Sequence, residues 1–346
     1  MRGSIRCSLP ARWTDPAGGP VKRRLILLAC VALGLAPGTW VRSAVPPPDY
    51  DSCVAITRLT DLPPRLGPFV TLNAWELDSN HHLFGSYSAL RATAPGEFLT
   101  ASDRGNVLRF TIEGDRLGIG PMARFNGEDR FAEKRASDIE ALAIDPKSGT
   151  VWAAYEGLNA IERRDARLRS PTRVRPPSMQ DWRSNSGPEA MLRFDDGRFI
   201  VIGEGTTRWT DDRMPAVLFA RDPAEGDPGM SFAFSAPEDF RPTDIAALPD
   251  GRVLFLLRRI VFGLPPRFEI GLLVADPAQI AEGETWSGEL LTVFSRPFPT
   301  DNYEGLAVEP TDGGYPVTIT MISDDNDIAY QRTLVAQLYW DGRAGR

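Results

Sequence analysis

The sequence is poor in the side chains that carry most nucleophilic and transition-metal chemistry. It has two histidines, His81 and His82, and three cysteines among 346 residues. Zinc sites are built mainly from these two residue types, so their scarcity excludes a histidine-rich or cysteine-rich zinc centre. A serine triad would have to use one of two adjacent histidines, and no Gly-x-Ser-x-Gly motif is present. Gly-x-Gly-x-x-Gly and Walker phosphate-binding loops are also absent.

Long apolar runs are missing too, and the one near the start is too short to span a bilayer. This run, Leu25 to Ala36, follows the basic triplet Lys22 to Arg24 and precedes a small-residue cleavage point at Ser43 and Ala44. The order is typical of an export signal. We therefore expect residues 1–44 to be a signal peptide region, with Val21 as a possible true start. The mature protein is expected to be periplasmic or secreted, with no stable membrane insertion.

Positive charge is in short supply. The chain has 39 basic and 46 acidic residues, a net charge of −7. Seven of the basic residues and one of the acidic ones lie in residues 1–44, so the exported part would carry about −13. Nucleic-acid binders need a basic surface, which argues against that class of partner. The exported part keeps one thiol, Cys53, expected to be a buried apolar group, and we expect a monomer.

What the sequence does contain is a repeat. A polar or acidic residue followed by a run of small and aliphatic residues occurs five times, at intervals of 49 to 60 residues. Each of these anchors is followed by two short apolar strands, a tight turn between them, and a second polar residue. The anchors are Ser88, Glu140, Glu189, Asp244 and Glu304, and the second polar residues are Asp103, Glu156, Glu204, Arg258 and Asp324.

A hairpin returns the chain to the level where it began, so anchor and second residue should lie at the same end of each unit. Repeats of this length made of short strands are typical of a β-propeller. We predict an all-β propeller over residues 66–342, most simply with six blades and alternatively with five. Residues 45–65 are interpreted as a linker and closing strand. Either Val54–Thr60 or Phe69–Leu77 is expected to pair with the last blade, because an open ring would leave bare sheet edges.

In such a ring the repeated carboxylates would gather at one mouth. They would repel one another unless a cation or bound protons neutralised them. Oxygen ligands suit a hard cation, so Ca²⁺ is the predicted ion. Arg104 and Arg258, at the same level, could hold an anionic oxygen. The candidate metal ligands are Glu140, Glu156, Glu189, Glu204, Asp244, Glu304 and Asp324.

Several motifs, in this order, resemble those of the bacterial phytase-like family that is known by the label "esterase-like activity of phytase". They are Phe84–Leu90, Ser102–Arg104, Asp138–Ala143, Glu156–Gly157, Asn185–Met191, Glu204, Asp301–Ala307 and Ser323–Asn326. The resemblance implies an exported β-propeller with activity on phosphate or carboxyl esters. The fourth repeat departs from the family pattern, because Thr243-Asp244 stands in place of Ser-Glu. Leu257 likewise takes the place of a glutamate before Arg258, which removes one possible ligand.

The leading hypothesis is a metal-dependent hydrolase of small anionic esters. In it Glu140, Glu189, Glu304 and Asp324 bind metal or activate water, while Arg104 and Arg258 hold the anion. A gluconolactonase-like lactonase, whose ion would lie near Asn185 and Asp244, is one alternative. A propeller that binds a ligand without catalysis is the other.

Overall fold

The structure is a computed structural model that describes residues 26–31, 47–126, 137–183, 187–205, 213–263, 267–328 and 330–343. The chain divides into two compact units, Met1–Pro48 and Asp49–Arg346. In the first unit, residues 26–31 form a short helix with exposed side chains.

Among the described residues, no helix combines the length and the apolar character that crossing a membrane requires.

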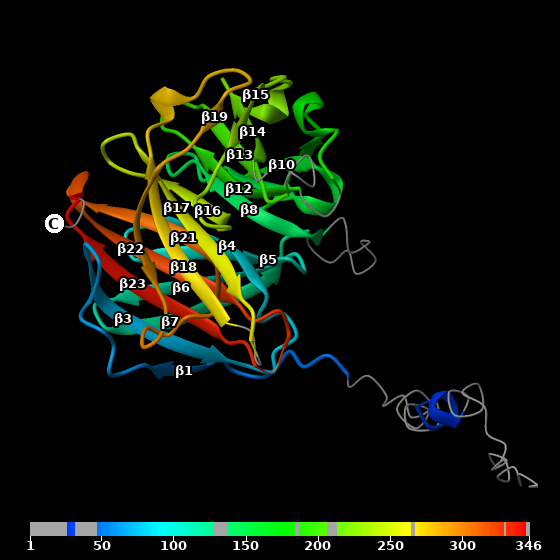
Figure 1. Ribbon diagram of the computed structural model, residues 1–346, viewed down its shortest axis with the longest axis vertical. Helices are drawn as coiled ribbons and strands as arrows, with labels where there is room; N and C mark the ends of the chain where they lie inside the picture. Colours follow the sequence, from blue (N-terminus) through cyan, green and yellow to red (C-terminus); the bar gives the residue numbers. More distant parts are fainter. Residues whose placement is uncertain are drawn as a thin grey trace, which may run out of the picture. The chain divides into compact units, whose positions relative to one another are not determined.

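The second unit is built from five antiparallel sheets, each one blade of a β-propeller (Figure 1). The first blade consists of β4 (Tyr87–Ala94), β5 (Glu97–Ser102), β6 (Asn106–Glu113) and β7 (Arg116–Arg124). The second consists of β8 (Ile139–Ile144), β9 (Val151–Tyr155), β10 (Ala160–Arg164) and β11 (Thr172–Val174). The third consists of β12 (Pro188–Arg193), β13 (Phe199–Gly203), β14 (Met214–Phe219) and β15 (Met230–Phe234), with β19 (Thr285–Trp286) added in parallel.

The fourth blade consists of β16 (Arg241–Ala247), β17 (Val253–Val261), β18 (Arg267–Ala275) and β20 (Glu289–Phe294). The fifth contains β21 (Asn302–Thr311), β22 (Gly314–Asp324) and β23 (Thr333–Trp340). It is completed by three strands from the start of the unit, β1 (Ala55–Arg58), β2 (Arg65–Leu66) and β3 (Phe69–Asp78). Four single-turn 3-10 helices lie in connections: η1 (Glu156–Leu158), η2 (Pro177–Met179), η3 (Pro223–Glu225) and η4 (Pro277–Gln279).

The propeller prediction is therefore confirmed, but the preferred count of six blades is wrong and the alternative of five is right. The reason lies in the early strands. They do not start a blade of their own, because β3 pairs with β23 and β1 pairs with β3. This pairing is the expected ring closure between early and late strands. Cys53, just before β1, is exposed rather than buried.

The innermost strands β4, β8, β12, β16 and β21 pack side by side, and β21 packs against β4 to complete the ring. The hydrophobic core divides into five clusters, one between each pair of neighbouring blades. Phe234 of the third blade stacks on Phe255 of the fourth with ring centroids 4.4 Å apart, which illustrates these contacts. The second strands β9 and β13 are buried along their whole length, so they are short apolar runs rather than alternating ones.

Candidate active site

Each innermost strand carries a β-bulge at the same place, and the bulged residues form a ring at one end of the propeller. In every blade the pairing with the second strand skips one residue near the start of the inner strand. A bulge turns the side chain of the extra residue away from its place in the pleat. The bulged residues are Ser88, Glu140, Glu189, Thr243 and Glu304.

The second polar residues also occupy equivalent places, directly after the second-strand residue that pairs just before each bulge. Three of them donate their backbone N–H to the carbonyl oxygen of the residue two positions before the bulge: Asp103 to Ser86, Glu156 to Asp138 and Glu204 to Gly187. In the other two blades the same positions pair in the sheet, Arg258 with Arg241 and Asp324 with Asn302. Anchor and second residue thus share one end of each hairpin, as expected.

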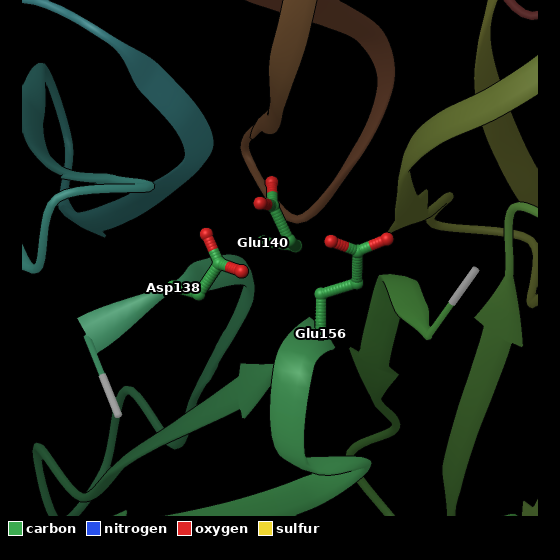
Figure 2. A group of neighbouring side chains, drawn as sticks. All are labelled: Asp138, Glu140 and Glu156. Carbon is green, nitrogen blue, oxygen red and sulfur yellow. The ribbon is translucent and has the colours of Figure 1, made fainter. Parts of the chain in front are cut away.

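Three acidic side chains meet in the second blade: the bulged Glu140, Asp138 two residues before it, and the second polar residue Glu156. Figure 2 shows Asp138, Glu140 and Glu156 with their carboxylates directed into a common space. Each offers an oxygen within 4.8 Å of the others, and Glu156 takes part in a second such group with Glu189 and Glu204. All five side chains are partly buried. The two groups therefore extend across the second and third blades, with Glu156 common to both.

The local backbone is shaped for this approach. Glu156 begins the single turn η1, which ends at Asn159 in the left-handed region with φ of 47°. Gly187 lies against this turn, and a Cβ on it would come within 2.6 Å of the Glu156 carbonyl oxygen and 2.8 Å of the Glu156 Cα. Only glycine leaves room there, so the close contact of the two blades depends on it.

Arg258 is the one cation among the second polar residues. Its guanidinium donates to Asn302 and Glu304 through Nη1, and to Glu204 through Nη2 at 3.1 Å. Asn302 in turn donates to Glu304 Oε1 at 2.7 Å and to Asp324 Oδ2 at 3.4 Å. Arg258 thus ties together carboxylates of the third and fifth blades.

Burial and neighbouring negative charges raise the pKa values of Glu140, Glu189 and Asp324. Burial raises the pKa of Glu140 well above its usual value, and the charges of Glu189 and Glu304 raise it further. Burial likewise raises the pKa of Glu189, with Glu204 as the next largest cause. For Asp324, burial followed by the Glu304 charge raises the pKa to about 9. Several protons or a cation are therefore needed to neutralise the group at neutral pH.

The pKa values of Glu304 and Arg258 are both raised, which favours the neutral form of the carboxyl group and the charged form of the guanidinium. Burial raises the pKa of Glu304, while the Arg258 charge and the Asn302 hydrogen bond act to lower it. Burial disfavours the charge on Arg258, but Glu304 and Glu204 outweigh it and raise its pKa. Arg258 remains a cation, and Glu304 is the carboxylate to which it is most directly coupled.

Asp244 does not lie with this group. It follows the bulge residue Thr243, at the position where the other blades have Ala89, Ala141, Ala190 and Gly305. Its oxygens accept from Arg91 at 2.7 and 2.8 Å and from the backbone N–H groups of Ile245 and Leu306 at 2.8 Å each. The side chain predicted as a metal ligand is thus committed to a buried ion pair, one residue out of register.

Arg91 places its guanidinium across the channel below the carboxylates. Besides Asp244 it donates to the carbonyl oxygens of Leu90, Met191 at 2.6 Å and Leu306 at 3.0 Å. These contacts link β4, β12, β16 and β21, which belong to four blades. The ion pair is almost entirely buried, with 11% of the Arg91 side chain and none of the Asp244 side chain exposed. We refer to Arg91 and Asp244 as the channel plug.

Arg104 lies apart from the carboxylates that Arg258 binds. It donates to the Phe84 carbonyl oxygen and forms a salt bridge with Asp327 at 2.8 Å. The expected pair of anion-holding arginines is therefore split, with one inside the carboxylate group and the other at a loop. Asn185, suggested for a lactonase-type site, falls outside the described residues.

Sequence reasoning missed Asp138 and Asn302 as members of the site. Both stand two residues before a bulge glutamate, Glu140 and Glu304 respectively. Each lies in a polar motif directly before an anchor, and this proximity in sequence is the signal that could have identified it.

The donor set of the site consists of carboxylate and amide oxygens. Hard cations such as Ca²⁺ bind six to eight oxygens and accept irregular geometry. Two groups of three carboxylates, each within 4.8 Å, fit such an ion. The residues that could hold it are Asp138, Glu140 and Glu156 in one group and Glu156, Glu189 and Glu204 in the other.

Comparison with known proteins adds a family. The family model described as "Phytase-like: Esterase-like activity of phytase" matches residues 82–327. No curated protein is similar enough in sequence to match the chain. A luciferin-regenerating enzyme matches at 11% identity over 85% of this chain and 98% of its own, with a TM-score of 0.45. Myxococcus xanthus glutaminyl cyclase matches at 14% identity over 74% and 91%, with a TM-score of 0.40.

Proposed function

This chain belongs to the phytase-like family. From that membership we propose that it hydrolyses phosphate or carboxyl esters at the carboxylate ring, the group formed by Glu140, Glu156, Glu189, Glu204 and Glu304. The observation that carries the proposal is the meeting of Glu140, Glu189 and Glu304 from three blades with Glu156 and Glu204. The pKa values of Glu140 and Glu189 are raised well above the usual value and that of Glu304 is raised as well, and perturbed pKa values of this kind are characteristic of sites that move protons. A purely structural ring would be better served by neutral side chains.

The proton steps are assigned by the neighbours of each carboxyl group. Glu304 accepts hydrogen bonds from Arg258 and Asn302, which favours its ionised form and makes it the base that takes a proton from water. The water oxygen bonds to the phosphorus or carbonyl carbon as the bond to the leaving oxygen breaks. Glu140, whose charged neighbours are carboxylates, keeps its proton and gives it to that leaving oxygen.

A divalent cation held by Glu156, Glu189 and Glu204 would polarise the oxygen of the ester and offset the negative charge of the site, and it would leave the proton of Glu140 in place. Support comes from the oxygen-only donor set and its spacing. We assign Arg258 to positioning, because its hydrogen bonds go to Glu204, Asn302 and Glu304.

The test is hydrolysis of chromogenic phosphate and acetate esters by the purified protein, with and without Ca²⁺ or a chelator. Glu140→Gln should lower kcat by about 10²-fold or more, the usual contribution of a general acid. The matched control is Glu113→Gln, which removes an exposed carboxylate at the opposite end of the first blade. If no ester is turned over while Ca²⁺ raises Tm, the protein is a ligand-binding propeller instead.

We also propose that the protein is exported, on the basis of the charged, apolar and small-residue segments within residues 1–44. The test is fractionation of cells that express the full chain, followed by N-terminal sequencing of the mature product. Cleavage near Ala44 is expected. A full-length chain retained in the cytoplasm would contradict export and leave the ester hydrolysis proposal intact.

A further inference from the structure

A pocket of about 850 Å³ lies between the fourth and fifth blades, beside the carboxylate ring. Its walls come from the ends of β17 and β18, the connection from β20 to β21 and the residues before β23. Asp301 lines the pocket, and the next residue, Asn302, is bonded to Arg258 and Glu304 in the site. The volume is within the range of small-molecule binding sites.

The charge balance of this pocket is opposite to that of the protein. Its two carboxylates already have arginine partners: Glu269 pairs with Arg259, and Asp301 accepts the backbone N–H of Arg332, whose Nε lies 3.8 Å away. Within the part of the chain that the structure describes, the side chains of Arg267 and Arg296 have no ion-pair or hydrogen-bond partner. Two uncompensated positive charges therefore line a hollow in a chain of net charge −7.

The remaining walls supply apolar surface and one unused acceptor. Phe268 is partly buried, and the Tyr330 ring is 57% exposed at the pocket. The side-chain oxygen of Gln331 is buried and has no hydrogen-bond donor among the described residues. A ligand that fits these features has an anionic group, an apolar or aromatic body and a hydroxyl or amide donor.

We propose that this pocket binds a small organic anion, held by Arg267 and Arg296 and packed against Phe268 and Tyr330. Its consequence for catalysis rests on the proposed function: the anion is the acidic part of the substrate. The carboxylate ring repels negative charge, whereas the pocket next to it attracts it. A substrate with an anionic group apart from its ester bond would then be held by that group in the pocket, with the ester bond at the carboxylate ring.

The direct test is calorimetric titration of the full chain with phenyl phosphate, phenylacetate and inorganic phosphate, with neutral benzyl alcohol for comparison. We expect both aromatic anions to bind, inorganic phosphate to bind more weakly because it has no apolar body, and benzyl alcohol not to bind. In Arg267→Gln/Arg296→Gln the affinity for the aromatic anions should fall about 25-fold, or fivefold for each charge at a contact distance of about 4 Å.

The matched control is Arg109→Gln/Arg116→Gln, which removes two exposed arginines of the first blade that also lack side-chain partners among the described residues. Its affinity should stay within twofold of the parent protein. The proposal is overturned if the parent and the Arg267/Arg296 variant bind the aromatic anions with equal affinity. It is also overturned if neither aromatic anion binds to the parent protein. Thermal unfolding of both variants checks that they fold.

Kinetics separate this inference from the proposed function. If esters are hydrolysed, the Arg267/Arg296 variant should raise KM for an anionic aryl ester while kcat and the KM for a neutral acetate ester stay unchanged. If no ester is hydrolysed but the anions bind and the variant loses them, the proposed function fails and the pocket stands. If esters are hydrolysed but the variant binds the anions as well as the parent does, the proposed function stands and the pocket proposal fails.

Discussion

Replacing Arg91 with methionine would leave Asp244 buried in the channel without a cation. Methionine is similar in length to the aliphatic part of arginine, so the main losses are the two contacts to Asp244 and the donors to Met191 and Leu306. Only the backbone N–H groups of Ile245 and Leu306 would still face the carboxylate. The variant therefore tests whether the channel plug stabilises the ring.

The expected cost is about 3–5 kcal/mol of unfolding free energy, because removing one partner of a buried ion pair leaves an uncompensated charge. A domain of this size loses roughly 2 °C of Tm per kcal/mol, so Tm should fall by about 5–10 °C. The double variant Arg91→Met/Asp244→Asn should be less destabilised than the sum of the two single variants predicts. We expect a coupling energy of about 2 kcal/mol from the cycle with Asp244→Asn.

The pH dependence has a defined sign. Burial raises the folded-state pKa of Asp244 above its usual 3.8, and without Arg91 only the backbone N–H groups of Ile245 and Leu306 oppose that rise. The folded variant then binds a proton more tightly than the unfolded chain, so its stability is greatest at low pH and falls as pH rises through the raised pKa. Arg91→Met should therefore lose less stability at about pH 5 than at about pH 8.

The measurement is urea unfolding of the parent, both single variants and the double variant at the two pH values. Additive effects, with a coupling energy below about 0.5 kcal/mol, would refute the assignment of Arg91 and Asp244 as a stabilising pair. A loss in Arg91→Met that is the same at both pH values would refute the claim that an ionised Asp244 causes it.

Two further predictions concern the carboxylate ring. Ca²⁺ affinity, measured by calorimetry, should rise from about pH 6 to pH 9, because burial raises the pKa of the candidate ligand Glu189 well above its usual value and this carboxyl group must lose its proton to bind. An affinity independent of pH would contradict this. Gly187→Ala should lower both Tm and ester hydrolysis, because the new Cβ would lie 2.6 Å from the Glu156 carbonyl oxygen. The control is Gly251→Ala, at a turn where the new Cβ has no atom within 4 Å. It should lower stability because of the φ of +85° and leave kcat unchanged.

The repeat in the sequence was sufficient to predict a propeller and the side-chain positions that meet at one end. Each anchor stands before a recognisable run of small residues, and its second residue follows a hairpin of nearly constant length. In the fourth blade the alignment by charge chose Asp244, whereas the bulge places Thr243 with Glu140 and Glu189. A bulge adds a residue without any sequence signal of its own, so this one-residue shift could not be predicted.

Other features depend on contacts between distant segments. Arg91 and Asp244 are 153 residues apart, and neither has a local partner that would suggest an ion pair. The number of blades depended on whether β1 and β3 form a blade or complete one. Their alternating apolar pattern is compatible with both, and the choice is made by pairing with β23 at the other end of the unit.

The joining of β3 to β23 has a consequence for when the protein can fold. The partner of this early strand is β23, which comes after the other propeller strands in the chain, so the circle of blades stays open until Thr333–Trp340 have been made. Until then the β3 edge has no neighbour and the fifth blade is incomplete. A chain that closes its ring this late stays incompletely folded while it is being made. The proposed export through a narrow protein-conducting pore requires such a state.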